Sequence, residues 1–73
     1  MPDIKPKQKK RIRDPEKTRE KILKATVDLV AEKGLEALSM KEAALRADVS
    51  RSVAYLHFDD RDHLLREAKA WMS

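Results

Sequence analysis

The side chains best suited to chemistry gather in one short stretch of the sequence. Between residues 51 and 57 the chain offers a guanidinium, a hydroxyl, a phenol and an imidazole, on Arg51, Ser52, Tyr55 and His57. This stretch contains no carboxylate, so none of these donors has an ion-pair partner within it. Phosphate oxygens and base edges accept hydrogen bonds from such groups. The stretch therefore predicts contact with nucleic acid.

Catalysis and metal binding find little support in the same sequence. His57 and His63 lie six residues apart, off a shared helical face. Asp59, Asp60 and Asp62 are crowded, but they fall at an expected helix start, where capping explains them. The sequence contains no glycine-rich phosphate loop, no nucleophile elbow and no cysteine. We therefore expect no enzyme and no cofactor, and a cation site at the three aspartates is the weaker alternative to a cap.

Residues 39–58 predict a helix-turn-helix that would position the donors. Ser39 is a candidate N-cap, with Glu42 at the spacing of a capping box. Asp48 tolerates the left-handed backbone of a tight turn, and Ser50 can cap the second helix. Small apolar residues at helical spacing mark the buried face of the first of these helices: Met40, Ala43, Ala44 and Ala47. Such a unit can place its second helix in a DNA major groove.

Three motifs in this stretch are distinctive enough for comparison with known families. They are A-D-V-S at the turn, Y-L-H-F at the end of the second helix, and R-D-H-L-L at the start of the next helix. Upstream stands T-R-E-K-I-L-K-A-T-V-D-L-V-A-E-K-G. Together, from residue 17 to about residue 65, they resemble the DNA-binding domain of TetR-family bacterial transcriptional regulators. The resemblance implies an all-α fold: a three-helix, homeodomain-like helix-turn-helix bundle plus the start of a fourth helix.

The expected DNA contacts start with the first turn of the second helix. Arg51 and Ser52 occupy the part of a recognition helix that meets base edges, and a bidentate Arg51–guanine contact is worth ~1–3 kcal/mol of discrimination. Val53 either touches a thymine methyl or packs inward. Tyr55 and His57 match the family's phosphate-contacting pair, with half-exposed packing as the alternative. The other DNA-binding candidates are Lys17, Thr18, Ser39, Lys41, Ser50 and Arg61.

Four residues depart from the family pattern. Asp48 stands where a turn glycine is usual, which adds strain and a negative charge near the DNA. Ala43 replaces a common isoleucine, and Ala54 replaces a larger aliphatic residue, so the core should be looser. Leu45 falls on a face that is normally polar.

The remaining helices frame this unit. The first should begin at Asp14-Pro15 and end at Gly34. Its apolar stripe is Ile22, Ala25, Thr26, Leu29, Val30 and the stem of Lys33. Leu35 and Leu38 should plug the gap between helices, and Phe58 should enter the core. Asp59 or Asp60 should cap a linker helix within 59–73, whose apolar stripe is Leu64, Leu65, Ala68, Trp71 and Met72. Trp71 packs either against a part of the protein that this sequence does not include or back against the first helix.

The charge is unevenly distributed. Of the net charge of +4, residues 1–13 carry +5 and the rest −1. We expect residues 1–13 to be a disordered basic arm that follows phosphates or enters the minor groove, with a solubilising tail as the alternative. Residues 14–73 would be the DNA-binding domain. The arm residues expected on DNA are Lys9, Lys10, Arg11 and Arg13.

Length and composition set the remaining expectations. The 73 residues suffice for one small domain, and one Phe, one Tyr and one Trp make a thin core, so we expect a piece of a longer protein. No apolar run approaches the ~20 residues of a membrane span, so no membrane contact is expected.

The function predicted from these features is sequence-specific DNA binding by a TetR-like regulator at a palindromic operator half-site. The resemblance implies the role of a repressor. The resemblance implies a homodimer formed through a C-terminal domain absent here, a small-molecule effector bound by that domain, and a location in the bacterial cytoplasm, at the nucleoid. The alternatives are a small helical protein-interaction module and a non-specific nucleic-acid binder that acts through its basic arm.

Overall fold

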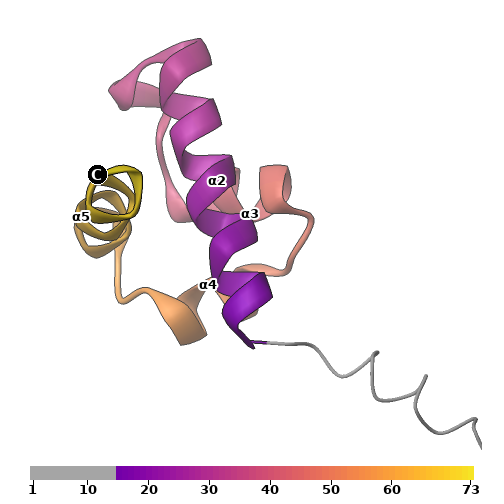
Figure 1. The fold of residues 1–73 in the computed structure, drawn as a ribbon. Coiled ribbons are helices and arrows are strands. Elements are labelled where there is room, and N and C mark those ends of the chain that lie inside the picture. The colour runs from indigo at the N-terminus through magenta and orange to yellow at the C-terminus, as the bar shows by residue number, and fades with distance from the viewer. Residues whose placement is uncertain (1–14) are drawn as a thin grey trace, which may run out of the picture.

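The computed structural model describes residues 15–73, and this part of the chain is helical without a strand. The predicted all-α fold is confirmed. Figure 1 shows α2 in the centre, with α3 and α5 beside it and α4 near its N-terminal end. The elements are α2 (Pro15–Lys33), the 3-10 turn η1 (Leu35–Ala37), α3 (Met40–Ala47), α4 (Arg51–His57) and α5 (Arg61–Met72). The predicted basic arm and the predicted cap Asp14 lie outside the described residues.

Side-chain caps begin three of these helices. Each capping oxygen accepts a hydrogen bond from the backbone N–H three residues later, which satisfies a donor that the helix itself leaves free. The pairs are Ser39 Oγ with Glu42 N at 3.0 Å, Ser50 Oγ with Val53 N at 3.1 Å, and Asp60 Oδ1 with His63 N at 2.9 Å. Both serine caps are confirmed, and of the two aspartate candidates Asp60 is the cap.

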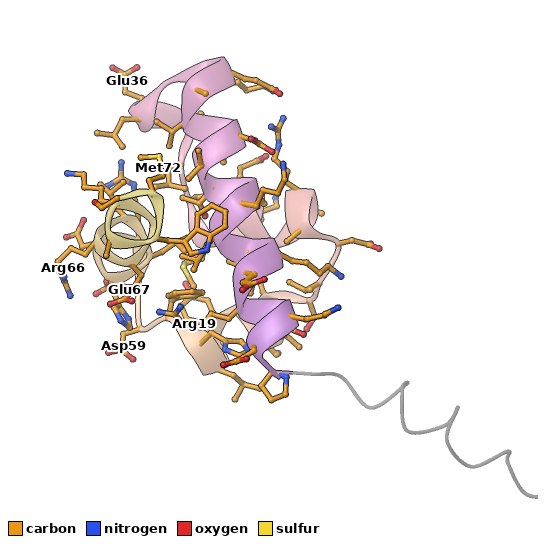
Figure 2. The ribbon with its side chains drawn as sticks, in the orientation of Figure 1. Arg19, Glu36, Asp59, Arg66, Glu67 and Met72 are labelled. Carbon is orange, nitrogen blue, oxygen red and sulfur yellow. The ribbon has the colours of Figure 1, made fainter. Side chains whose placement is uncertain are left out.

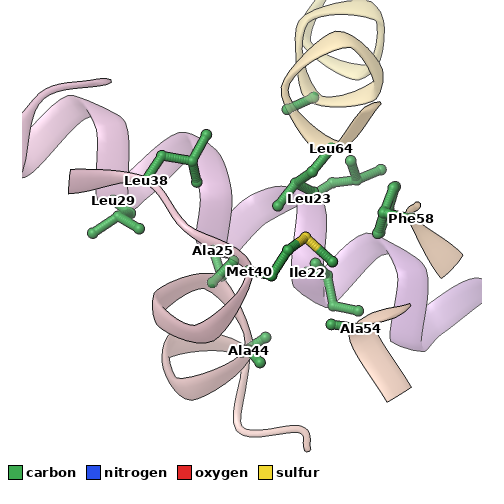
Figure 3. Packing of buried hydrophobic residues seen from close by; sticks show 13 residues of the cluster. Ile22, Leu23, Ala25, Leu29, Leu38, Met40, Ala44, Ala54, Phe58 and Leu64 are labelled. Carbon is green, nitrogen blue, oxygen red and sulfur yellow. The ribbon is translucent and has the colours of Figure 1, made fainter. Parts of the chain in front are cut away.

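The core lies on one face of α2, where α3, α4 and α5 converge (Figure 3). Ile22 and Leu23 are fully buried there, and Phe58 and Leu64 close the core from the other side. The only buried polar side chain among the described residues is Thr26, whose hydroxyl donates to the carbonyl of Ile22 at 2.8 Å. Much of the rest of the core is alanine: Ala25, Ala43, Ala44, Ala47, Ala54 and Ala68. Such small side chains let the helix backbones approach closely.

Two details of the predicted core are corrected. Leu35 is 46% exposed, so only Leu38, at 2%, fills the gap between the helices. Leu23 is fully buried although the predicted stripe omitted it, because α2 packs against neighbours on two sides and its buried face is correspondingly wide.

The far end of α5 stays largely open. Trp71 keeps 43% of its surface exposed and Met72 keeps 60%, so the described part of the chain covers neither completely. Met72 lines an apolar groove of about 350 Å³ between α2 and α5, together with Val30, Leu35 and Leu65. Within the described residues no helix combines the length and apolar character that a membrane span requires.

Ion pairs tie α2 to two of its neighbours. Arg46 of α3 donates to Glu32 at 2.7 Å, and this hydrogen bond lowers the pKa of the Glu32 carboxyl and raises the pKa of Arg46. Any stabilisation from the lowered pKa is present above the unfolded-state pKa of Glu32 and is lost as the pH falls through the folded-state value. Arg19 pairs with Glu67 of α5, and Figure 2 shows the two side chains turned toward each other.

The stop of α2 generates a first prediction. Gly34 has φ 92° and ψ 163°, a conformation that is essentially restricted to glycine, and its N–H donates to Val30 O at 2.8 Å. A Cβ at this position would meet open space, so only backbone strain opposes Gly34→Ala. We expect the substitution to lower the free energy of unfolding by about 1–3 kcal/mol in urea titrations. Lys33→Ala, one residue earlier in the helix, is the control, and equal stability of Gly34→Ala and the control would contradict the argument.

Candidate nucleic-acid interface

The exposed face of α4 carries three of the predicted donors. Arg51 and Ser52 are exposed, and Tyr55 keeps 51% of its surface accessible. On the opposite side Ala54 is completely buried against the core. A helix of seven residues fixed in this way can present only one face outward. That face is the one on which the sequence placed its hydrogen-bond donors.

Two candidates lie at the edge of this face. Val53 and His57 are half-buried, and the His57 ring lies 6.2 Å from the Phe58 ring, centroid to centroid. For Val53, half-burial fits both a contact with a thymine methyl and inward packing. Its predicted role, like the phosphate contact predicted for His57, stays a prediction.

A groove of about 300 Å³ runs between α3 and the start of α4. Its lining includes Lys41 and Arg51, so the structure brings these two predicted cations to one surface. Ser50 also lines this groove, and its hydroxyl oxygen caps α4. Ser39 is similarly engaged, because its hydroxyl caps α3. Both serines thus begin helices. In each cap the oxygen only accepts, so the O–H remains a donor and the DNA contacts predicted for Ser39 and Ser50 stay predictions.

The turn between α3 and α4 depends on Asp48. Its backbone has φ 63° and ψ 43°, the left-handed conformation predicted for it, and it is the one non-glycine residue of the described part with a positive φ. Its N–H donates to Leu45 O at 3.1 Å, which closes α3. The price of this geometry is small for aspartate compared with most residues, because its short polar side chain tolerates the left-handed region. The carboxylate is exposed, close in sequence to Ser50 and Arg51.

The first turn of α2 lies beside α4 (Figure 1). Lys17 is exposed there and Thr18 is half-buried. Arg19, which follows them, places its guanidinium 5.4 Å from the centroid of the Phe58 ring, the residue that ends α4. This contact fixes the start of α2 relative to the end of α4, so Lys17 and Thr18 are held close to the helix that carries the base-reading candidates.

Arg61 is turned toward the protein. Its Nε donates to Leu38 O and its Nη2 to Leu35 O, both at 2.9 Å, and its Nη1 lies 3.5 Å from the Asp62 carboxylate. The guanidinium thereby binds the connector that precedes α3. The phosphate contact predicted for Arg61 stays a prediction, but the structure gives the residue a second role that sequence spacing did not indicate.

Sequence reasoning also missed two features of this surface. Leu56 is 81% exposed on α4, although its spacing of four residues from Ser52 could have placed it on the outward face. His63 secures the exit from α4, because its Nδ1 accepts the Asp59 N–H at 2.9 Å and its ring meets Phe58 edge-on at 5.6 Å. Within residues 15–73 no three potential ligands are arranged to hold a metal ion.

The second role of Arg61 can be tested with Arg61→Lys. Lysine keeps the charge but cannot reproduce the two directed bonds to Leu35 and Leu38, so we expect a loss of about 1–3 kcal/mol of unfolding free energy. Urea denaturation followed by circular dichroism measures it. Arg66→Lys, on the exposed side of α5, is the matched control and should be neutral. Unchanged stability of Arg61→Lys would show that the two bonds contribute nothing.

Comparison with known proteins identifies the domain. The family described as bacterial regulatory proteins, tetR family, matches residues 22–68. The HTH-type transcriptional repressor KstR of Rhodococcus jostii (strain RHA1) is 42% identical over 52 residues, which cover 71% of this chain and 24% of the repressor. The crystal structure of a TetR-family transcriptional regulator from Haemophilus influenzae RD matches with a TM-score of 0.74 and 35% identity, over 78% of this chain and 31% of that one. This chain, which spans less than a third of either relative, therefore belongs to the TetR family and holds its N-terminal, DNA-binding helix-turn-helix domain.

Proposed function

We propose that this domain reads one half of a palindromic operator with α4 in the major groove, as part of a repressor. The observation that carries the proposal is the exposed face of α4, where Arg51, Ser52 and Tyr55 project from a helix whose other side is buried. Because recognition helices meet base edges through their N-terminal residues, Arg51 and Ser52 would read the bases. The repressor role draws on KstR, whose name describes a transcriptional repressor.

Phosphate contacts would surround this reading face. Lys41 at the start of α3 would contact one side, and Lys17 and Thr18 at the start of α2 the other. Tyr55 and His57 would donate to the backbone between them. Contacts of this kind set the register of the helix without carrying sequence information.

The basic arm would add affinity without adding much specificity. Residues 1–13 carry a charge of +5, and each neutralised phosphate contributes to a salt-dependent term in binding. Lys9, Lys10, Arg11 and Arg13, which lie outside the described residues, are the proposed contacts. Removing the arm should therefore weaken binding and leave the preferred sequence unchanged.

The whole regulator would act as a dimer. Both relatives are more than three times as long as the part that matches, and we place the dimer contact and an effector site in that additional length. Two-fold symmetry would set the half-sites a helical turn apart, ~34–36 Å, or a multiple of it. Such a regulator would act in the bacterial cytoplasm, at the nucleoid.

The proposal is tested by selecting bound sequences from a random duplex pool at about 0.1 M salt. The wild-type chain should enrich a half-site, and Arg51→Ala should lose preference at one position, by ~1–3 kcal/mol. Arg66→Ala is the matched control, because Arg66 points away from α2 on α5 (Figure 2). Retention that depends on salt but enriches no sequence would favour a non-specific binder that acts through the arm.

The charge of Asp48 gives a separate prediction. Asp48→Asn keeps a residue that tolerates φ 63° and removes a negative charge three residues before Arg51, so it should bind DNA more tightly than the wild type. Asp48→Gly should do the same and also unfold at a higher urea concentration, because glycine relieves the left-handed strain. Titration of a labelled duplex measures the affinities. Weaker binding by both variants would place Asp48 among the residues that assist DNA binding.

A further inference from the structure

Leu56 contributes little to the fold that holds it. Its side chain is 81% exposed, more than any other large apolar residue of the described part, while Ala54 and Phe58 on the same segment are 0% and 1% exposed. Truncating Leu56 would therefore remove almost no buried surface. Its apolar side chain is presented to the solvent in the middle of a polar face.

The position of Leu56 is fixed by the surrounding contacts. It lies four residues after Ser52 and directly after Tyr55, so the three side chains share the outward face of α4. The helix is capped by Ser50 at one end and anchored by Phe58 at the other. Homeodomain recognition helices read bases from positions four residues apart, which is the spacing of Ser52 and Leu56.

We propose that Leu56 contacts the 5-methyl group of a thymine in the operator and determines specificity at that base pair. The inference depends on the proposed function, in which α4 enters the major groove. The thymine methyl is the one apolar group that unmodified bases present there. Against cytosine, the same leucine would cover an amino donor without offering it an acceptor, so the wrong base pair is penalised as well.

Deoxyuridine provides the direct test, because it pairs as thymine does but lacks the 5-methyl group. In the half-site selected by the wild-type chain, each thymine is replaced in turn by deoxyuridine, and the affinity of each duplex is measured. For the wild type we expect one position at which the replacement costs about fourfold, the effect of exposing one methyl group. For Leu56→Ala the same replacement should cost nothing further, which is the coupling that a double-mutant cycle detects.

The matched control is Met72→Ala, a second apolar residue of the same domain that is 60% exposed, at the far end of α5. This variant should show the same deoxyuridine profile as the wild type. Because Leu56 is so exposed, Leu56→Ala should unfold at the same urea concentration as the wild type, which separates a lost contact from a lost fold.

The possible outcomes distinguish a failure of the Leu56 contact from a failure of the proposed function. A half-site enriched by the wild type, with identical deoxyuridine profiles for the wild type and Leu56→Ala, would overturn the role of Leu56 and leave the proposed function standing. No enriched half-site at all would overturn both, since no operator would then exist for Leu56 to read. One thymine whose effect is coupled to Leu56, with no such coupling for Met72→Ala, would establish the contact.

Discussion

The buried face of α2 is the constraint on which the rest of the domain depends. Its 19 residues form the one long helix of the described part, and α3, α4 and α5 all pack against it (Figure 3). Helices of eight and seven residues, the lengths of α3 and α4, are unstable in isolation, because most of their stability must come from packing. The geometry of the α4 face proposed to read DNA therefore depends on packing against Ile22 and Leu23 of α2.

Polar contacts then fix the relative orientation of the helices that apolar packing holds together. The Arg19 guanidinium contacts Phe58 and Glu67, and so joins α2, the end of α4 and α5. Arg61 binds the connector before α3, and His63 binds the backbone after α4. The start of α5 is thus bonded to both ends of the helix-turn-helix. A displacement of α5 would therefore shift the start of α3 and the end of α4 together.

Local rules predicted most of the fold, and long-range contacts account for what they missed. The caps Ser39 and Ser50, the stop at Gly34 and the left-handed Asp48 all follow from residue type and immediate neighbours, and the structure contains them. The bonds of Arg61 span 23 and 26 residues, so no spacing within a helix could reveal them. The outward face of α4 was predictable from its polar residues, whereas the exposure of Leu56 was overlooked because apolar residues are usually assigned to cores. The roles of these side chains on DNA remain proposals, since they depend on a partner that no property of the chain alone defines.

Ala54 limits how closely α4 can approach α2, because its methyl group is completely buried in the core that the two helices share. A larger side chain there would have to lift or tilt α4, and overpacking of this kind typically costs about 1–3 kcal/mol. How far the outward face of α4 projects from the domain is thus set by Ala54, a buried residue that DNA cannot contact. A substitution at this one buried position can therefore change how α4 meets DNA while every residue that contacts DNA stays the same.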